Sequence, residues 1–141
     1  MTDTGVKSGA PRWLRSLAAV LAGFFVVVVL STAADAAMHA TGVFPPADQR
    51  MEDPLLFLLA LAYRGLFTLL GGCVTARLAP ASPMRHALAL AALGLLAGML
   101  GIMAALASDL GPLWYAIAVA VSGPPCVVLG GWMVARRATP A

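Results

Sequence analysis

The hydrophobic positions of this chain gather into four long runs that polar residues barely interrupt. The runs extend over Leu14–Met38, Leu55–Leu78, Met84–Ala107 and Leu113–Ala135. Each run exceeds the about 20 apolar residues that an α-helix needs to cross the hydrocarbon core of a bilayer. The pattern therefore predicts an all-α, polytopic membrane protein whose four transmembrane helices form a four-helix bundle.

Proline marks the start of every run. It stands at Pro11, Pro54, Pro83 and Pro112, just before or at the first residues of each apolar segment. Proline suits the first turn of a helix because the amide hydrogen that it lacks would have no partner there. Asp53 and Ser82 directly precede two of these prolines, and both are predicted to cap the helix that follows.

The composition supports a membrane protein and gives no indication of a nucleic-acid partner. The chain is 61% hydrophobic and 11% charged, with a mean hydropathy of +0.91, whereas soluble domains are about 45–50% apolar and about 25% charged. The formal net charge is +3, but most of the arginines lie at the ends of apolar runs rather than in one patch. Cys73 and Cys126 fall inside apolar runs, so they are expected to be packing residues and not a disulfide framework.

Basic residues are distributed unevenly over the connections, which predicts the orientation. Arg50 is the one basic residue expected on the side of the membrane where the second and fourth helices begin. Seven basic residues are expected on the opposite side: Lys7, Arg12, Arg15, Arg77, Arg85, Arg136 and Arg137. Positive charge is retained in the cytoplasm, so both termini of this multi-pass protein are predicted to be cytoplasmic, in a bacterial inner membrane. Residues 1–10 are expected to be a disordered N-terminus and residues 138–141 a short tail.

One alternative concerns the first run. Its basic start, the apolar residues Leu17–Leu30 and the sequence Ala34-Asp35-Ala36 resemble a cleavable signal peptide. Cleavage there would remove the first span and leave the remaining three without it.

An octapeptide occurs twice in the chain. Leu-Gly-Gly-Cys-Val-Thr-Ala-Arg at residues 70–77 returns as Leu-Gly-Gly-Trp-Met-Val-Ala-Arg at residues 129–136, identical at five of eight positions. The repeat predicts two duplicated helical hairpins, at residues 11–80 and 81–137, related by a pseudo-two-fold axis along the membrane normal. Convergence is the alternative, because glycine, alanine and terminal arginine are common in such helices.

Small residues predict where the helices pack. Without a hydrophobic driving force in lipid, glycine and alanine let helix backbones approach closely. The expected packing glycines are Gly71, Gly72, Gly94, Gly98, Gly101, Gly130 and Gly131. Their partners are helices of this chain, a second copy in a homo-oligomer, or another membrane protein. Pro124 and Pro125 lie within the fourth run and are predicted to kink or locally unwind it.

A few polar residues lie within the apolar runs and form the candidate site. Arg64 is ten residues past Pro54, about 15 Å along a helix, and a central arginine costs at least about 2.5 kcal/mol on insertion scales. Asp35, near the outer end of the first span, is the expected counter-ion, because the long side chain of Arg64 can extend toward it. Tyr63 lies at the depth of Arg64, and His39 shares the helix face of Asp35. The cluster is either an ion pair that joins the first two helices or a transport or ligand site. The position aligned with Arg64 in the second repeat is Gly123 or Pro124.

The sequence offers little support for other chemistry. His39 and His86 are predicted near opposite membrane faces, so they cannot ligate one haem, and no metal-ligand spacing is diagnostic. No nucleotide-binding loop, nucleophile elbow or pair of catalytic carboxylates occurs. We therefore expect no metal, no cofactor and no enzymatic activity. Trp13, Trp114 and Tyr115 are expected to anchor helix ends at the interface.

Several stretches resemble a family of small, uncharacterised bacterial proteins with four transmembrane helices. They are His39-Ala-Thr-Gly-Val-Phe-Pro-Pro, Tyr63-Arg64, Gly71-Gly72 with Ala76-Arg77-Leu78-Ala79-Pro80, Met84-Arg85-His86-Ala87-Leu88, and Gly111-Pro-Leu-Trp-Tyr. The resemblance covers roughly residues 15–135 and implies no activity. In size and span number the chain also resembles small multidrug exporters. Those carry a glutamate within the first span, whereas the acidic residue here is Asp35, near the outer end.

Two functions follow as hypotheses. The first is a small transporter or ion or solute pathway that uses the candidate polar cluster. The second is a non-catalytic accessory or assembly protein that packs against membrane partners through its glycine-rich helix faces. They differ in one structural requirement: transport needs a water-accessible cavity that reaches Arg64, and an accessory protein does not.

Overall fold

The computed structural model describes residues 10–46, 48–108 and 111–137. These ranges contain four helices, which are α1 (Arg12–Ala40), α2 (Pro54–Leu78), α3 (Pro83–Ala107) and α4 (Leu113–Ala135). Each is long and apolar enough to cross a membrane, and the described ranges contain no strand. The predicted all-α, four-helix membrane bundle is confirmed, and every predicted span lies inside an observed helix. The predicted disordered terminus, except Ala10, and the predicted tail lie outside the described residues.

Local sequence explains where α2 and α3 begin. The side chain of Asp53 accepts a hydrogen bond of 2.8 Å from the backbone N–H of Leu55, and Pro54 occupies the first turn of α2. Ser82 occupies the N-cap position of α3 as predicted, but its side chain does not repeat this arrangement. Its backbone is left-handed (φ 45°), its side chain makes no capping bond, and its carbonyl instead accepts from the N–H of Arg85 at 3.0 Å.

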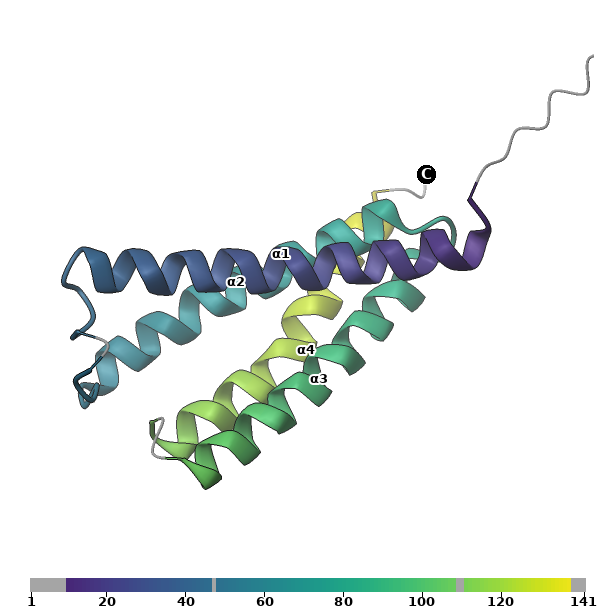
Figure 1. Ribbon diagram of the computed structural model, residues 1–141. Helices are drawn as coiled ribbons and strands as arrows, with labels where there is room; N and C mark the ends of the chain where they lie inside the picture. The colour runs from purple at the N-terminus through teal and green to yellow at the C-terminus, as the bar shows by residue number, and fades with distance from the viewer. Residues whose placement is uncertain (1–9, 47, 109–110, 138–141) are drawn as a thin grey trace, which may run out of the picture.

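The helices converge at one end and separate at the other (Figure 1). We call the first the basic end, because it holds the arginines that flank the helices, and the second the loop end, because residues 41–53 connect α1 to α2 there. The buried core lies toward the basic end, where Ala87, Leu90 and Ala91 of α3 meet Val127 of α4. Toward the loop end, α1 and the α3–α4 hairpin move apart, whereas the ring of Phe57 on α2 stays in contact with those of Trp114 and Tyr115 on α4.

Glycine contacts hold the converging ends together. A Cβ atom on Gly72 would lie 2.2 Å from the carbonyl oxygen of Val127, and one on Gly130 would lie 2.1 Å from that of Leu69. These two glycines therefore allow the backbones of α2 and α4 to touch, as small residues do in membrane helices. Sγ of Cys73 adds a hydrogen bond of 3.3 Å to the carbonyl of Gly130.

The other member of each glycine pair contacts its own hairpin partner. A Cβ on Gly71 would lie 2.9 Å from the carbonyl oxygen of Gly23 on α1, and one on Gly131 would lie 2.4 Å from Cβ of Ala87 on α3. Gly71 and Gly72 thus face α1 and α4 in that order, whereas Gly130 and Gly131 face α2 and α3. The doubled octapeptide packs with its two glycines in exchanged roles, and the duplication itself stays a prediction.

The GxxxG segment of α3 divides into packed and open positions. A Cβ on Gly98 would lie 2.8 Å from Cβ of Ala120, so this glycine joins α3 to α4. A Cβ on Gly94 or Gly101 would meet nothing within 4 Å. The expected close packing therefore occurs at Gly98, whereas Gly94 and Gly101 pack closely against no described residue of this chain.

Helix α4 continues through its two internal prolines. Pro124 and Pro125 both lie inside the helix Leu113–Ala135, so the predicted local unwinding is wrong. Proline cannot donate a backbone hydrogen bond, so the carbonyls one turn earlier, at Ala120 and Val121, lack their usual partners. A kink at this point stays a prediction.

Candidate functional site

The structure brings three of the four candidate residues into contact. Asp35 lies in the last third of α1, and Tyr63 and Arg64 lie side by side on α2. The hydroxyl of Tyr63 donates a hydrogen bond to Oδ1 of Asp35, and Nη2 of Arg64 donates to Oδ2 of the same carboxylate in a salt bridge. One carboxylate thereby joins α1 to α2 through two charge-assisted bonds. We call Asp35, Tyr63 and Arg64 the polar triad.

The ion pair explains how a central arginine is tolerated in an apolar helix. A charged side chain near mid-membrane is normally paired, or faces the bundle interior or a water-filled cavity. Here the pair is only partly buried, since the side chains of Arg64 and Asp35 are 32% and 31% exposed. Nε of Arg64 is buried and has no hydrogen-bond partner among the described residues. The pair is therefore neither sealed nor fully satisfied.

His39 lies near the triad without bonding to it. Nδ1 of its ring is 2.7 Å from the carbonyl oxygen of Pro45, which can only accept, so this nitrogen carries the proton. The ring also packs edge-on against Phe44, with centroids 5.5 Å apart. These contacts hold the loop of residues 41–46 against the end of α1. His39 thus positions the loop that borders the triad.

Two cavities meet at Arg64. The first, of about 530 Å³, lies at the loop end, and we call it the loop pocket. Its walls are polar and apolar side chains of α1, the 44–51 loop and α2, including Asp35, His39 and Gln49. The second, of about 460 Å³, runs between α1 and the α3–α4 hairpin, and we call it the apolar groove. Arg64, Gly111 and Tyr115 line both cavities.

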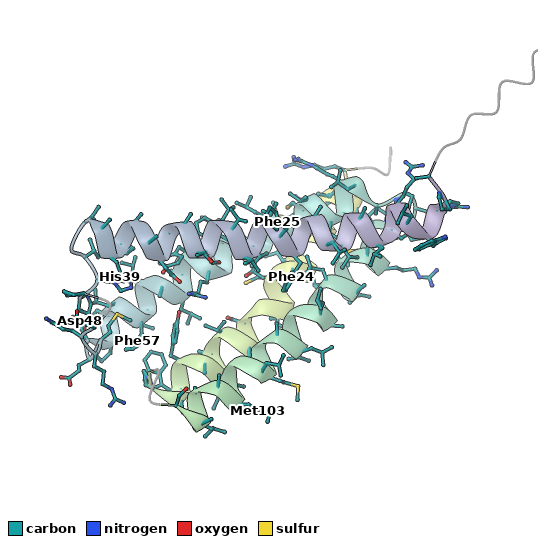
Figure 2. The ribbon with its side chains drawn as sticks, in the orientation of Figure 1. Phe24, Phe25, His39, Asp48, Phe57 and Met103 are labelled. Atoms are coloured by element: carbon teal, nitrogen blue, oxygen red, sulfur yellow. The ribbon has the colours of Figure 1, made fainter. Side chains whose placement is uncertain are left out.

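Side-chain directions agree with this division of space (Figure 2). His39 and Asp48 lie at the loop end, close to Phe57, whereas Phe24 points from α1 toward the α3–α4 hairpin and Phe25 points away from the bundle. Phe24 lines the apolar groove, and Phe25 is 67% exposed on the outer face of α1. The groove is thus a space between the hairpins that Phe24 borders and Phe25 does not.

Tyr115 belongs to the site although the sequence predicts only an interfacial anchor. Its ring packs 5.0 Å from that of Phe57, which links the loop ends of α4 and α2. This contact places Tyr115 on the walls of both cavities, together with Arg64. The position has no sequence signal, because α4 is apolar on all sides and its pattern does not show which face is inward.

The glycines without close contacts also line the groove. Gly94 and Gly101 of α3 and Gly123 of α4 are groove residues, and a Cβ on any of them would meet nothing within 4 Å. Gly123 is one of the two positions aligned with Arg64 in the sequence repeat. Because these glycines have no side chains, the groove stays open beside Arg64 of α2.

Neither a metal site nor a match to a known protein helps to assign a function. Within the described ranges, no group of three or more His, Cys, Asp or Glu side chains lies close enough to hold a metal ion. Comparisons of the chain with protein-family models, with curated protein sequences and with solved structures give no match. The triad and the two cavities are therefore the features of the described residues from which a function can be inferred.

Proposed function

We propose that this multi-pass membrane protein is a small transporter or solute-pathway component in which Arg64 contacts the solute. One observation carries the proposal: Arg64 is paired with Asp35 and yet lines both the loop pocket and the apolar groove. A purely structural ion pair is best sealed between its two helices, because burial away from water strengthens it. The partial exposure of this pair instead provides a charged group along a route from the loop end into the membrane.

The orientation of this route follows from the charges. Six arginines of the described chain flank the helices at the basic end: Arg12, Arg15, Arg77, Arg85, Arg136 and Arg137. Because basic residues stay in the cytoplasm, we place the basic end inside and the loop pocket at the outer face of a bacterial inner membrane. We also propose that the protein is a member of the small bacterial four-span family that it resembles and that it is not an enzyme.

Substitution of Arg64 by glutamine tests the role of its charge. Glutamine can still donate a hydrogen bond to Asp35, so α1 and α2 stay joined while the cation is lost. In cells that lack the natural copy of the gene, we expect this variant to reach normal abundance in the membrane. It should nevertheless fail to restore the distribution of small molecules and lipids between cells and medium, measured by untargeted mass spectrometry.

The control for this experiment is Arg85→Gln, which removes an exposed charge at the start of α3. This variant should restore the wild-type distribution. If Arg64→Gln restores it equally well at equal abundance, the charge has no transport role and the proposal is wrong. If all Arg64 variants are lost from the membrane, the pair is structural and the accessory function is favoured.

The accessory function has one observation in its favour. A Cβ on Gly94 or Gly101 of α3 would meet nothing within 4 Å in the chain, and small residues of this kind pack against partner helices in membranes. A second copy or another membrane protein would then occupy the apolar groove.

A further inference from the structure

We infer that the apolar groove holds the alkyl chain of a long-chain carboxylate, a fatty acid anion, whose carboxylate binds at Arg64. The inference rests on the proposed function and names the substrate class of the same site. Three features of the groove carry it: its length and open glycine positions, the exposure of its rim within the membrane, and the partly exposed guanidinium of Arg64 on its wall.

The groove has the length and volume of a single-chain ligand. Along α3 it is lined from Leu90 to Ala105, which is about 22 Å at the helical rise per residue. One leaflet of the hydrocarbon core is about 15 Å thick, so the groove extends over a depth of the membrane comparable to that of one alkyl chain. Its volume of about 460 Å³ is within the range of pockets that hold one small ligand, about 300–1,000 Å³.

The groove is closed at its inner end and exposed along its rim. A Cβ on Gly23 would lie 3.1 Å from Cδ2 of Leu90, so α1 and α3 are in contact there. Farther toward the loop end, Val28 on α1 and Ala97 and Gly101 on α3 line the groove and are exposed. All three lie within helices that span the membrane, so the rim faces acyl chains rather than water. An apolar space of this kind does not hold water well, and it is accessible to an alkyl chain by lateral diffusion.

The guanidinium of Arg64 marks where the head group binds. Arg64 and Tyr115 both line the groove, and the side chain of Arg64 is 32% exposed although its Nη2 bonds to Asp35. A carboxylate has a negative charge and two acceptor oxygens, which complement the guanidinium of Arg64 and the hydroxyl of Tyr115.

The depth of Arg64 favours a small head group. Arg64 lies ten residues into α2 from Pro54, about 15 Å from the loop end of the helix. The phosphate of a two-chain lipid resides in the interface, whereas a carboxylate is small enough to enter to this depth. A partner helix is about 10 Å wide, and over the length of the groove it would displace more than the available 460 Å³. The loop pocket then gives the carboxylate a polar route between Arg64 and the outer face.

Asp35 competes with this ligand for Arg64, so removing its charge should strengthen ligand binding. Its carboxylate occupies Nη2 of Arg64, and its negative charge repels a second anion at short range. Asp35→Asn keeps the size and one acceptor oxygen but removes the charge. The variant should therefore bind a fatty acid anion more tightly, whereas a merely structural role of Asp35 predicts unchanged or weaker binding.

Electron paramagnetic resonance of spin-labelled stearic acid measures the binding directly. The full chain is reconstituted in phosphatidylcholine bilayers, and the immobilised fraction of the label is compared with that of spin-labelled methyl stearate and spin-labelled phosphatidylcholine. We expect stearate to associate at least threefold more strongly than either uncharged or zwitterionic probe at neutral pH. Asp35→Asn should raise the preference severalfold, and Arg64→Gln should abolish it.

Two further variants locate the site in the groove. Gly94→Leu combined with Gly101→Leu fills the groove with side chains and should remove the stearate preference. Ala92→Leu combined with Ala104→Leu places the same side chains at exposed positions of α3 outside the groove and should leave the stearate preference unchanged. Equal binding of stearate and its methyl ester, or unchanged binding in the filled variant, would overturn the inference. A preference for phosphatidylcholine over stearate would also overturn the inference. The same holds if the wild type is a dimer and the Gly94→Leu, Gly101→Leu variant is not.

The outcomes separate this inference from the proposed function. If stearate binds at the groove but Arg64→Gln restores the distribution of solutes in cells, the site is a lipid site and transport is wrong. If Arg64→Gln fails in cells but stearate has no preference, the pathway carries another solute and the fatty acid assignment is wrong.

Discussion

Replacing Gly72 by alanine is expected to lower the free energy of unfolding by about 3 kcal/mol, at the upper end of the usual cost of overpacking. The new Cβ would lie 2.2 Å from the backbone carbonyl oxygen of Val127. A backbone atom cannot rotate away, so α2 and α4 must separate at the point where they hold the two hairpins together. Gly130→Ala should have the same effect, because its Cβ would lie 2.1 Å from the carbonyl oxygen of Leu69. Unfolding of the purified protein by sodium dodecyl sulfate, followed by tryptophan fluorescence, measures the change.

Gly94→Ala and Gly101→Ala are the matched controls for this prediction. They make the same chemical change in the middle of a helix, but their Cβ atoms would meet nothing within 4 Å. Alanine is a better helix former than glycine by about 1 kcal/mol, so these variants should be as stable as the wild type or slightly more stable. Equal destabilisation by all four substitutions would show that close contact between α2 and α4 is not what holds the bundle together.

Replacing Asp35 by alanine is expected to destabilise the protein by about 2 kcal/mol, although the position is only half-buried. The substitution leaves the guanidinium of Arg64 and the hydroxyl of Tyr63 without their shared acceptor. Breaking a buried ion pair costs about 3–5 kcal/mol, and an exposed pair contributes about 0–1 kcal/mol. Because both side chains are about one-third exposed, the loss should fall between these limits in the same unfolding titration.

A double-mutant cycle separates the pair from its surroundings. Arg64→Met keeps much of the side-chain volume and removes the charge that Asp35→Ala leaves unpaired. The double variant should therefore be more stable than Asp35→Ala alone, with a coupling energy of about 1–2 kcal/mol. If the two substitutions are simply additive, Arg64 and Asp35 do not interact in the folded protein, and the triad is wrongly assigned.

The spans and the polar triad were accessible from the sequence for the same physical reason. Lipid offers no partner for a polar group, so four apolar runs have one plausible structure, and Asp35 and Arg64 stand out within them. Approximate depth along the helices was then enough to predict that the two side chains meet. Tyr63 followed because it precedes Arg64 and carries a hydroxyl group.

The arrangement around the triad was not accessible from the sequence. Helices that are apolar on all sides do not show which face turns inward, so neither the place of Tyr115 nor the open positions Gly94 and Gly101 could be predicted. The exchanged roles of the repeated glycines have the same origin. Ser82 is the N-cap of α3 as predicted, but its side chain makes no capping bond, and its left-handed backbone (φ 45°) could not be predicted from the sequence.

The central claim is that Arg64 lies deep in the bundle and is nevertheless reached by water from the outer face. Replacing Arg64 by cysteine, after Cys73→Ser and Cys126→Ala have removed the native thiols, tests this claim with a membrane-impermeant, cationic methanethiosulfonate reagent added to intact cells. Such reagents react with the thiolate, which forms only where water is present. Leu66→Cys is the control, because Leu66 lies two residues farther along α2, is 56% exposed and lines neither the loop pocket nor the apolar groove.

We predict that the cysteine at position 64 is modified from outside and that the cysteine at position 66 is not. The same result requires the loop pocket to face outward, so it also tests the orientation inferred from the charges. A cysteine at position 64 that reacts no faster than the one at position 66 would contradict the account, because Arg64 would then be sealed and the triad would be a structural pair.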